Sequence, residues 1–309
     1  MKAAQINSYG NGTVRVNMDA PEPKAAPGKI LVEVHAAGAN PFDWKLAKGM
    51  FQEMMPFPLP GTLGGDFSGV VAESDNARFK RGDAVYGQAH VFSGGSGSFA
   101  EVLSANIGNI AEKPERLSHV EAAALPLTGA SAIQALIDSM HLTKGMKILI
   151  HGGAGGIGTI AIQLARHLGA YVATTVTKKD EAYAKKFGAD TIIDYESERF
   201  EDVAKGYDAV FDTVGGETYA RSFKVLKKGG IIVSMLEQPN EQLMGAYGVK
   251  AVSQSTQVTR ARLEKLKEFV DERAIQVNVD KTFSLEDAAA ALAYLETGHP
   301  KGKVVLKIR

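Results

Sequence analysis

The spacing of apolar residues divides the chain into two parts of different texture. Up to about residue 117, short apolar runs rich in β-branched residues are separated by Gly, Pro and Asn turn signals. Seven of the eleven prolines lie in the first sixty residues. This part predicts a compact, irregular β domain, whose expected strands are TVRVNM (13–18), KILVEVHAA (29–37), FSGVVAES (67–74) and DAVYGQ (83–88).

From residue 118 the pattern changes to apolar strands that alternate with helices, two of which are expected to end near Gly169 and Gly188. Strands separated by helices of about ten residues or more predict a parallel sheet with helices on both faces. The expected fold class is therefore α/β, with six parallel strands: KILIHG (147–152), YVATTV (171–176), TIIDY (191–195), DAVFDTVG (208–215), GGIIVSML (229–236) and VKAVSQ (249–254).

The last segment fits neither pattern. It contains a helical pattern at 260–272, a short run at 275–280, a second helical pattern at 285–296 and a last strand at 302–308. We expect this segment to return to the first domain. The expected organisation is a β-rich domain over 1–117, a parallel-sheet domain over 118–256 and a returning segment over 257–309.

Composition then narrows the class of protein. With 309 residues, 45% of them hydrophobic and 23% charged, the chain can bury a large core. Basic and acidic residues number 35 each, so the charge balance does not favour nucleic acid or a membrane surface as partner. The absence of cysteine excludes disulfides, thiolate catalysis and Cys-ligated zinc or iron–sulfur centres. No apolar run suggests a signal peptide or a membrane span, so we expect a cytoplasmic protein.

The segment HGGAGGIG (151–158) lies between an expected strand and an expected helix. Gly153, Gly155 and Gly158 fit the G-x-G-x-x-G pattern in the βαβ context that dinucleotide binding requires. Glycines there allow a tight turn, close approach of a pyrophosphate, and close packing of helix and strand. The pattern therefore predicts a dinucleotide site that includes Gly156 and Ile157, and the alternative is a glycine turn that binds nothing.

The end of the next strand indicates which dinucleotide binds. An NAD site usually has Asp or Glu about 20 residues beyond the fingerprint to bind the ribose 2′-hydroxyl. This chain has Thr174 to Thr177 there, followed by Lys178 and Lys179. Hydroxyls and cations favour a 2′-phosphate, so we expect NADPH, with Thr177 and both lysines in contact with it. The alternative is that both lysines are solvated residues at the start of a helix.

Ordered motifs along the whole chain resemble the medium-chain dehydrogenase/reductase superfamily, in its zinc-free quinone oxidoreductase and enone reductase branch. The resemblance implies a GroES-like substrate domain interrupted by a Rossmann domain with a doubly wound six-stranded parallel sheet. The motifs are HAAGANPFDWKLAKG (35–49), LGGDFSGVV (63–71), FKRGDAVYG (79–87), GSFAEV (97–102), AAALPLTGASA (122–132), the glycine loop, FGADTIIDY (187–195), FDTVGG (211–216) and GKVVL (302–306).

The resemblance also implies that the catalytic zinc is missing. Zinc alcohol dehydrogenases of the superfamily have metal ligands where this chain has Asn40, Gly65, Asp66 and, nearby, Ala124. A catalytic zinc needs three protein ligands, and one Asp does not hold it. We therefore expect no metal site, and we expect the seven histidines, such as His35 and His151, to be ordinary core or surface residues.

Loss of zinc narrows the reaction that we expect. Alcohol oxidation needs a group that stabilises an alkoxide, which the metal normally does. Hydride addition to a quinone or an α,β-unsaturated carbonyl spreads the charge onto an oxygen, so a few hydrogen-bond donors and correct placement suffice. The resemblance implies that Asn40 faces the nicotinamide. Asp43 and Trp44 are candidates for the substrate pocket; the alternatives are that Asp43 caps a short helix and that Trp44 packs the domain.

The remaining expected cofactor contacts follow from the resemblance and from the rule that open α/β sheets bind ligands beyond the carboxyl ends of their strands. Thr128 is expected to contact the cofactor and Tyr195 to lie beside the adenosine phosphate. The tips of two further strands and the last motif complete the set: Val214, Gly215, Ser234, Met235, Leu236 and Lys303.

Two other classes of function stay open at this stage. One is a non-catalytic NADPH-binding structural or sensor protein, and the other is an acyl-carrier-linked enoyl reductase. The resemblance also implies a homodimer joined through the outer strand VKAVSQ of the Rossmann sheet. Loops such as FQEMMPFPLP (51–60) are expected to form the substrate pocket.

Overall fold

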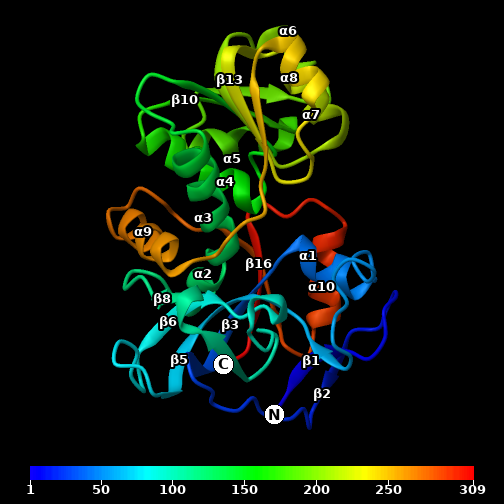
Figure 1. Cartoon of the computed structure of the whole chain (residues 1–309), viewed down its shortest axis with the longest axis vertical. Helices are drawn as coiled ribbons and strands as arrows, with labels where there is room; N and C mark the ends of the chain where they lie inside the picture. The colour runs from blue at the N-terminus through cyan, green and yellow to red at the C-terminus, as the bar shows by residue number, and fades with distance from the viewer. The chain divides into compact units, whose positions relative to one another are not determined.

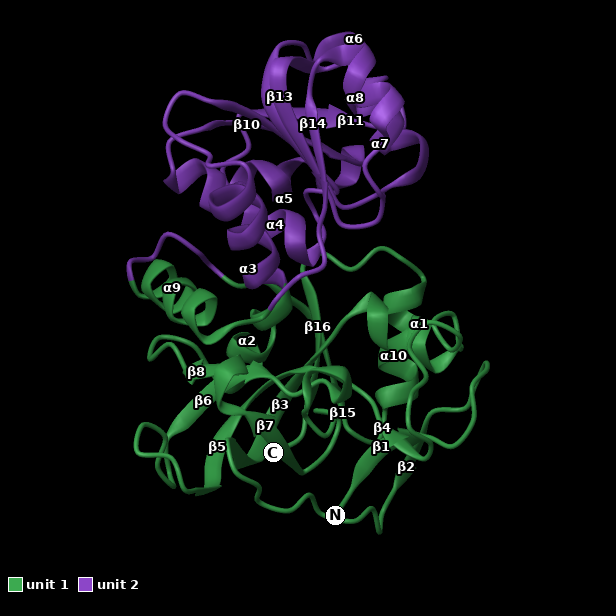
Figure 2. Cartoon of the chain, in the orientation of Figure 1, with its two compact units in different colours: residues 1–127, 258–271, 277–309 green, residues 128–257, 272–276 purple.

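The computed structural model describes residues 1–309, and these form two compact units (Figure 2). Unit 1 contains Met1–Leu127, Val258–Asp271 and Val277–Arg309, and unit 2 contains Thr128–Gln257 and Glu272–Gln276. The returning segment therefore belongs mostly to the first unit. The first boundary lies at Leu127, beyond the expected residue 117, because helix α2 (His119–Ala123) packs on the sheet of unit 1.

Unit 1 is built on a seven-stranded sheet of order β15-β16-β3-β5-β6-β8, with β7 also paired to β3 (Figure 1). A second sheet has the order β2-β1-β4. The strands are β1 (Ala3–Ile6), β2 (Arg15–Asn17), β3 (Lys29–Ala39), β4 (Gly61–Thr62), β5 (Asp66–Ser74), β6 (Ala84–Gln88), β7 (Val102–Asn106), β8 (Ile110–Glu112), β15 (Val279–Ser284) and β16 (Lys303–Lys307). The helices are α1 (Pro41–Ala47), η1 (Val91–Ser93), η2 (Ile107–Asn109), α2, α9 (Arg260–Asp271) and α10 (Ala288–Glu296).

Unit 2 has a six-stranded sheet of order β11-β10-β9-β12-β13-β14 in which all neighbours are parallel. This is the order of the Rossmann fold. The strands are β9 (Lys147–His151), β10 (Tyr171–Val176), β11 (Thr191–Asp194), β12 (Tyr207–Asp212), β13 (Leu226–Ser234) and β14 (Lys250–Ser253). The helices are α3 (Pro126–Ile133, which crosses the boundary), η3 (Gln134–Ser139), α4 (Gly156–His167), η4 (Lys178–Asp180), α5 (Glu181–Lys186), α6 (Phe200–Val203), α7 (Gly216–Ser222) and α8 (Glu241–Tyr247).

Both faces of the unit 2 sheet are covered. On β9, Leu149 belongs to an apolar cluster with Phe200, Tyr219 and Phe223 from α6, α7 and the chain just after α7. Successive strand residues point to opposite faces, so the neighbours of Leu149 face the other side, where α4 packs on β9 and β10. The continuous apolar strands of the sequence therefore reflect burial on both faces.

The GroES-like plus Rossmann prediction is confirmed. The structure differs from it at some element ends and adds the short strands β1, β4, β7 and β8 to the four expected in the first part. The short helix near Asp43 includes that residue and begins at Pro41, because proline suits the first helical position. The run at 275–280 contributes only the start of β15, which begins at Val279 and pairs in parallel with β16. No helix of the structure is both long and apolar enough to cross a membrane.

The end of β3 is tightly packed at Gly38. A Cβ atom added there would lie 2.2 Å from the carbonyl oxygen of Ala123 in α2 and 3.2 Å from the Cβ of Asp66. The opposing atom at Ala123 belongs to the backbone, so it cannot move aside by a change of rotamer.

We therefore expect Gly38→Ala to lower the stability of unit 1 by about 1 to 3 kcal/mol through overpacking. Urea and thermal unfolding followed by circular dichroism measure this change. The matched control is Gly108→Ala, whose added Cβ would meet its nearest atom at 3.7 Å. Equal stability of the two variants would contradict the packing argument.

Candidate functional site

Three strand ends of unit 1 meet at one point. β3 is paired antiparallel with β5 on one side and with β16 on the other. The register places Gly38 opposite Asp66, and Ala39 opposite Val304. Asp66 and Lys303, at the starts of their strands, therefore flank the position where β3 ends and Asn40 begins.

The side chain of Asn40 is bonded from both sides. Its Nδ2 donates to Asp66 Oδ2 at 3.0 Å, and its Oδ1 accepts from Lys303 Nζ at 2.5 Å. The same ammonium donates to the carbonyl oxygen of Ala39 at 2.7 Å. All three side chains are buried, with Asn40 at 5%, Lys303 at 6% and Asp66 at 0% exposure. We call these three residues the buried polar cluster.

Further donors stabilise the carboxylate of Asp66. The backbone N–H of Leu127 donates to Oδ2 at 3.2 Å, and Gln88 Nε2 donates to Oδ1 at 3.3 Å. Burial raises the pKa of Asp66, while the nearby Lys303 ammonium and these donors oppose the rise. Burial lowers the pKa of Lys303, and the charges of Asp66 and Asp43 oppose that change. The cluster thus holds charged groups out of water by giving them hydrogen-bond partners.

Asp43 acts on the start of α1. It is 1% exposed, and its Oδ2 accepts the backbone N–H of Asn40, the N-cap residue, at 2.7 Å. Burial raises the pKa of Asp43 to about 7, against the effect of that hydrogen bond. The structure therefore favours the capping alternative for Asp43 over a position in an open substrate pocket.

Trp44 packs against the apolar cluster of unit 1 that contains Leu46 and Leu292. Its indole N–H is buried without a hydrogen-bond partner. The ammonium groups of Lys45 and Lys48 lie 5.6 and 5.4 Å from the centre of its ring, within cation–π range. These contacts favour packing of the domain as the role of Trp44.

An aromatic surface that the sequence did not reveal adjoins the buried polar cluster. Phe42 stacks on Phe51 at 5.1 Å between ring centres and meets His90 at 4.9 Å, and His90 stacks on Phe92 at 5.1 Å. Burial lowers the pKa of His90 to about 4, so this ring is neutral near pH 7. Phe42 lies on the first turn of α1, two residues after Asn40. The surface consists of Phe42 in α1, Phe51 in the turn that follows it, and His90 and Phe92 at and in η1.

The second link of this aromatic surface to the cluster is Gly65. A Cβ atom added to Gly65 would lie 3.3 Å from His90 Cδ2, so the His90 ring packs beside the residue that precedes Asp66. The contact between His90 and Gly65 could not be predicted from the sequence, because the two residues are 25 positions apart: Gly65 precedes β5 and His90 follows β6. The β5–β6 pairing brings the segment of His90 and Phe92 beside Gly65, where these rings meet those of Phe42 and Phe51.

A catalytic zinc does not fit the residues present at the former metal position. The ammonium of Lys303 lies within hydrogen-bond distance of Asn40, where a divalent cation would be repelled. Asp66 already accepts three donors. The structure brings together no group of three His, Asp or Glu residues that could hold a metal ion.

The glycine loop of unit 2 fits a dinucleotide. β9 ends at His151 and α4 starts at Gly156, with Gly155 as its N-cap. A Cβ atom added to Gly158 would lie 2.2 Å from the carbonyl oxygen of Gly152, and one added to Gly153 would lie 2.1 Å from Thr174 Oγ1. The loop therefore needs glycine at these positions, and the first N–H groups of α4 are available to an anion. Ile157 follows as the second residue of the helix.

The end of β10 presents cations but fewer hydroxyls than expected. Thr174 and Thr175 are buried. The hydroxyl of Thr174 donates to the carbonyl oxygen of Ile150, and the hydroxyl of Thr175 bonds to the His151 ring and accepts from the backbone N–H of Gly152. Thr177 is also buried and donates to Asp180 Oδ2 at 2.8 Å. The hydroxyls of Thr174, Thr175 and Thr177 thus already have hydrogen-bond partners inside the unit.

Lys178, Lys179 and Tyr195 remain on the surface at this end of the sheet. Lys178 Nζ donates to Glu181 Oε2 at 2.5 Å, and this ion pair raises its pKa. Tyr195 is 52% exposed and lies directly after β11, which ends at Asp194. The cations are available, and Glu181 is a competing partner for one of them.

Asp212, which the sequence analysis did not select, organises the neighbouring strand tips. It is fully buried, and its Oδ1 accepts the backbone N–H groups of Val214 and Gly215, each at 3.0 Å. Its Oδ2 accepts the hydroxyl of Ser234 at 2.7 Å. The sequence feature that could have revealed this role is the position of Asp212, an acidic residue at the end of the otherwise apolar strand β12. Asp212 thus fixes the loop after β12 to the end of β13.

The expected cofactor residues at these tips divide into two kinds. Val214 and Leu236 are about half exposed, at 50% and 53%, while Gly215 and Ser234 are buried. Met235 is half-buried. Thr128, in α3, is 3% exposed. His151 is a core residue of this unit, since its ring nitrogens contact Thr175 and Ser222.

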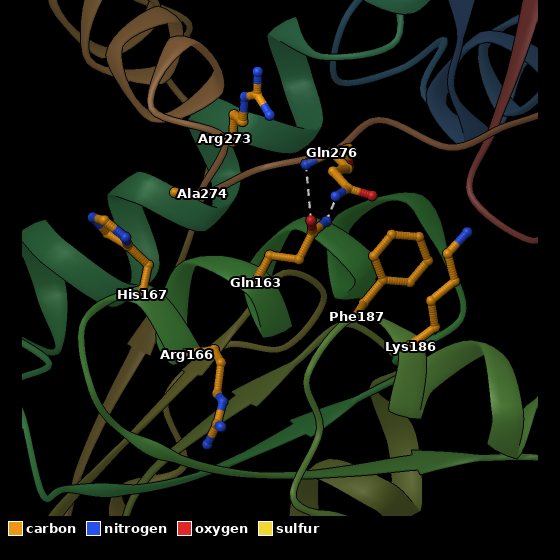
Figure 3. A pocket seen from close by; sticks show the side chains of 8 residues that line it. All are labelled: Gln163, Arg166, His167, Lys186, Phe187, Arg273, Ala274 and Gln276. Atoms are coloured by element: carbon orange, nitrogen blue, oxygen red, sulfur yellow. Dashed lines mark hydrogen bonds between the residues drawn. The ribbon is translucent and has the colours of Figure 1, made fainter.

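A separate cavity of about 280 Å³ lies at the other end of α4 (Figure 3). Its lining includes Arg166, Lys186 and Arg273, but Figure 3 shows that the charged ends of these side chains lie apart from one another. Gln163 spans one wall by bonding both the N–H and the carbonyl of Gln276. The cations do not converge on a ligand, so this cavity is a packing feature that attaches residues 272–276 to unit 2.

Comparison with known proteins agrees with this arrangement. Residues 26–115 match the alcohol dehydrogenase GroES-like domain, and residues 187–306 match the zinc-binding dehydrogenase family. A 2-methylene-furan-3-one reductase of Solanum lycopersicum is 35% identical over 99% of this chain and 79% of its own length.

Solved structures give the same result. The quinone oxidoreductase of Coxiella burnetii has a TM-score of 0.90 at 34% identity, covering 100% of this chain and 99% of that one. The Escherichia coli quinone oxidoreductase solved with NADPH has a TM-score of 0.88 at 26% identity, covering 99% and 100%. The chain belongs to the medium-chain dehydrogenase/reductase superfamily, in its quinone oxidoreductase branch. It is an oxidoreductase.

The residues at the former metal position generate a prediction. We expect purified protein to contain no stoichiometric zinc, because the Lys303 ammonium and the three hydrogen bonds already made to Asp66 disfavour a divalent cation there. Elemental analysis measures bound zinc, and activity should survive treatment with a strong chelator. A zinc-dependent alcohol dehydrogenase treated in parallel is the control and should lose activity. One tightly bound zinc per chain would overturn this reading of the site.

Proposed function

We propose that this protein uses NADPH to transfer hydride, without zinc, to a quinone or an α,β-unsaturated carbonyl compound. The observation that carries the proposal is the buried polar cluster, in which Asn40 lies where zinc relatives have a metal ligand and its amide is bonded to the ammonium of Lys303 and the carboxylate of Asp66. Unit 2 supplies the cofactor site, and unit 1 supplies the acceptor site. The relatives named as a furanone reductase and quinone oxidoreductases support this substrate class.

The cofactor assignment rests on the glycine loop and on the cations after β10. Gly153 and Gly158 leave the space that the pyrophosphate backbone contacts need, and Lys178 and Lys179 favour the 2′-phosphate of NADPH. No carboxylate ends β10 in the position that usually binds the 2′-hydroxyl of NAD. Tyr195, Val214 and Leu236 are exposed at the ends of neighbouring strands and complete the surface that we assign to NADPH.

The chemistry that bound NADPH supplies is hydride donation from its nicotinamide. Addition of hydride to the conjugated carbon of the acceptor moves an electron pair onto the acceptor oxygen, and water supplies the proton that completes the reduction. Asn40 Nδ2 carries two hydrogens, of which one is bonded to Asp66. We assign the second to the acceptor oxygen, where a preorganised donor stabilises developing charge.

The aromatic surface supports a planar acceptor. Phe42, Phe51 and Phe92 present ring faces and edges next to the buried polar cluster, and Phe92 is 37% exposed. Stacking on such rings favours flat conjugated molecules over small flexible alcohols. The phenyl rings carry no ionisable group and His90 is neutral near pH 7, so the surface suits an uncharged acceptor.

The family relationship favours an enzyme over a non-catalytic NADPH-binding protein or an acyl-carrier-linked reductase module. A homodimer through β14 and residence in the cytoplasm remain part of the proposal. β14 is the edge strand of its sheet and pairs only with β13, so its outer edge can pair with a second copy. Analytical ultracentrifugation of the intact protein tests this assembly.

Replacement of Lys178 tests the cofactor assignment. We expect Lys178→Ala to weaken NADPH binding about tenfold and to leave NADH binding nearly unchanged, because only NADPH carries the 2′-phosphate. The unpaired Glu181 carboxylate adds repulsion in the variant. Titration of cofactor fluorescence measures both dissociation constants. Lys224→Ala, an exposed lysine elsewhere in unit 2, is the control. Equal losses for both cofactors would contradict the assignment, and a silent variant calls for the double change with Lys179.

A comparison of acceptors tests the reaction. We expect NADPH oxidation with 9,10-phenanthrenequinone or a simple enone, and little or no NADP⁺ reduction with ethanol or propanol. Alkoxide formation lacks a stabilising cation at the reacting oxygen, whereas an enolate or hydroquinone anion delocalises its charge. Absorbance of the reduced cofactor measures both directions under the same conditions. Turnover of alcohols without turnover of conjugated acceptors would contradict the proposed function.

A further inference from the structure

The buried polar cluster contains a lysine whose ammonium has no established task in the reaction. Lys303 is 6% exposed, and its Nζ donates to Asn40 Oδ1 and to the carbonyl oxygen of Ala39. A buried ammonium is costly unless it is bonded, and an apolar residue at the start of β16 would avoid that cost. The contacts themselves indicate what the lysine does there.

An asparagine side chain can rotate by half a turn and exchange its oxygen and nitrogen with little change in shape. Lysine is only a donor, and an ionised carboxylate is only an acceptor. With Lys303 on one side and Asp66 on the other, only one orientation of the Asn40 amide satisfies both neighbours. The exchanged orientation would place two donors together and two acceptors together.

We propose that Lys303 is a positioning residue that, with Asp66, fixes the orientation of the Asn40 amide so that its second N–H is presented to the acceptor. This inference rests on the proposed function of Asn40. The geometry supports it from three elements, because the lysine begins β16, the amide follows β3 and the carboxylate begins β5. Lys303 acts through Asn40 and makes no contact with the acceptor.

The cation has a second effect on the same amide. A positive charge bonded to Oδ1 at 2.5 Å draws electron density from the amide and makes its N–H groups stronger donors. In this arrangement the Asn40 amide lies between the Lys303 ammonium and the position proposed for the acceptor oxygen. The bond of Ala39 to the same ammonium keeps that charge at the end of β3.

A double-mutant cycle tests whether Lys303 acts through Asn40. Lys303→Met keeps the apolar stem and removes the ammonium, and we expect it to lower kcat about tenfold with little change in the KM for NADPH. In an Asn40→Ala background, the same substitution should change kcat by less than about twofold, because the group it positions is absent. Lys307→Met, at an exposed lysine of the same strand, is the matched control and should leave kcat unchanged.

The outcomes of the cycle are distinct. An equal loss in both backgrounds would mean that Lys303 contacts the reacting atoms itself, which would overturn the positioning role. An unchanged kcat in folded Lys303→Met would overturn it as well. If Lys303→Met does not fold by circular dichroism, Asp66→Asn removes the obligate acceptor on the other side of the amide and should show the same dependence on Asn40.

A measurement that needs no turnover separates this inference from the proposed function. In protein labelled with ¹⁵N-asparagine, the Asn40 side-chain signals are identified by their loss in Asn40→Ala. A fixed and fully bonded amide should show slow hydrogen exchange, and Lys303→Met should speed that exchange at least about tenfold. Unchanged exchange would refute the fixed amide. If the wild-type protein turned over no quinone or enone, the proposed function would fail, while this measurement would still decide the orientation of Asn40.

Discussion

A buried ammonium group holds the active part of unit 1 together. Lys303 needs acceptors because it lies out of water, and the acceptors that it finds are the last carbonyl of β3 and the side chain of the residue that follows. Asn40 in turn bonds to Asp66. The hydrogen bonds that the buried ammonium needs therefore join the starts of β16 and β5 to the end of β3. The orientation of α1, with the aromatic surface on its first turn, follows from this junction.

In unit 2, a buried carboxylate holds strand ends together in a similar way. Asp212 has no lysine beside it; three hydrogen-bond donors from the tips of β12 and β13 satisfy it. The loops that we assign to NADPH are therefore held by the strand end itself. In both units, the exposed residues beyond the strands depend on one fully buried acid, Asp66 or Asp212.

The sequence predicted the parts of the fold that repeat along the chain, and missed contacts that bring distant segments together. Apolar strands, helices and the glycine loop have local signatures, so the Rossmann sheet could be expected with its six strands in order. Lys303 and Asn40 are far apart in sequence, and only the β3–β16 register makes them neighbours. The contact between His90 and Gly65 also depends on strand pairing. The hydrogen bond from Thr177 to Asp180 is local, but the sequence pattern does not show which way the threonine hydroxyl points.

The place of β16 in the sheet has a consequence for how the chain folds. The sheet of unit 2 is built from one continuous stretch of sequence, whereas β16 inserts between β15 and β3 in the sheet of unit 1. During synthesis, unit 2 can therefore assemble while β3 still has an open edge that waits for residues 303–307. β7 covers the first half of this edge, so Ala36–Ala39 form the part that stays unpaired until β16 arrives. An open strand edge is a template for pairing with other chains.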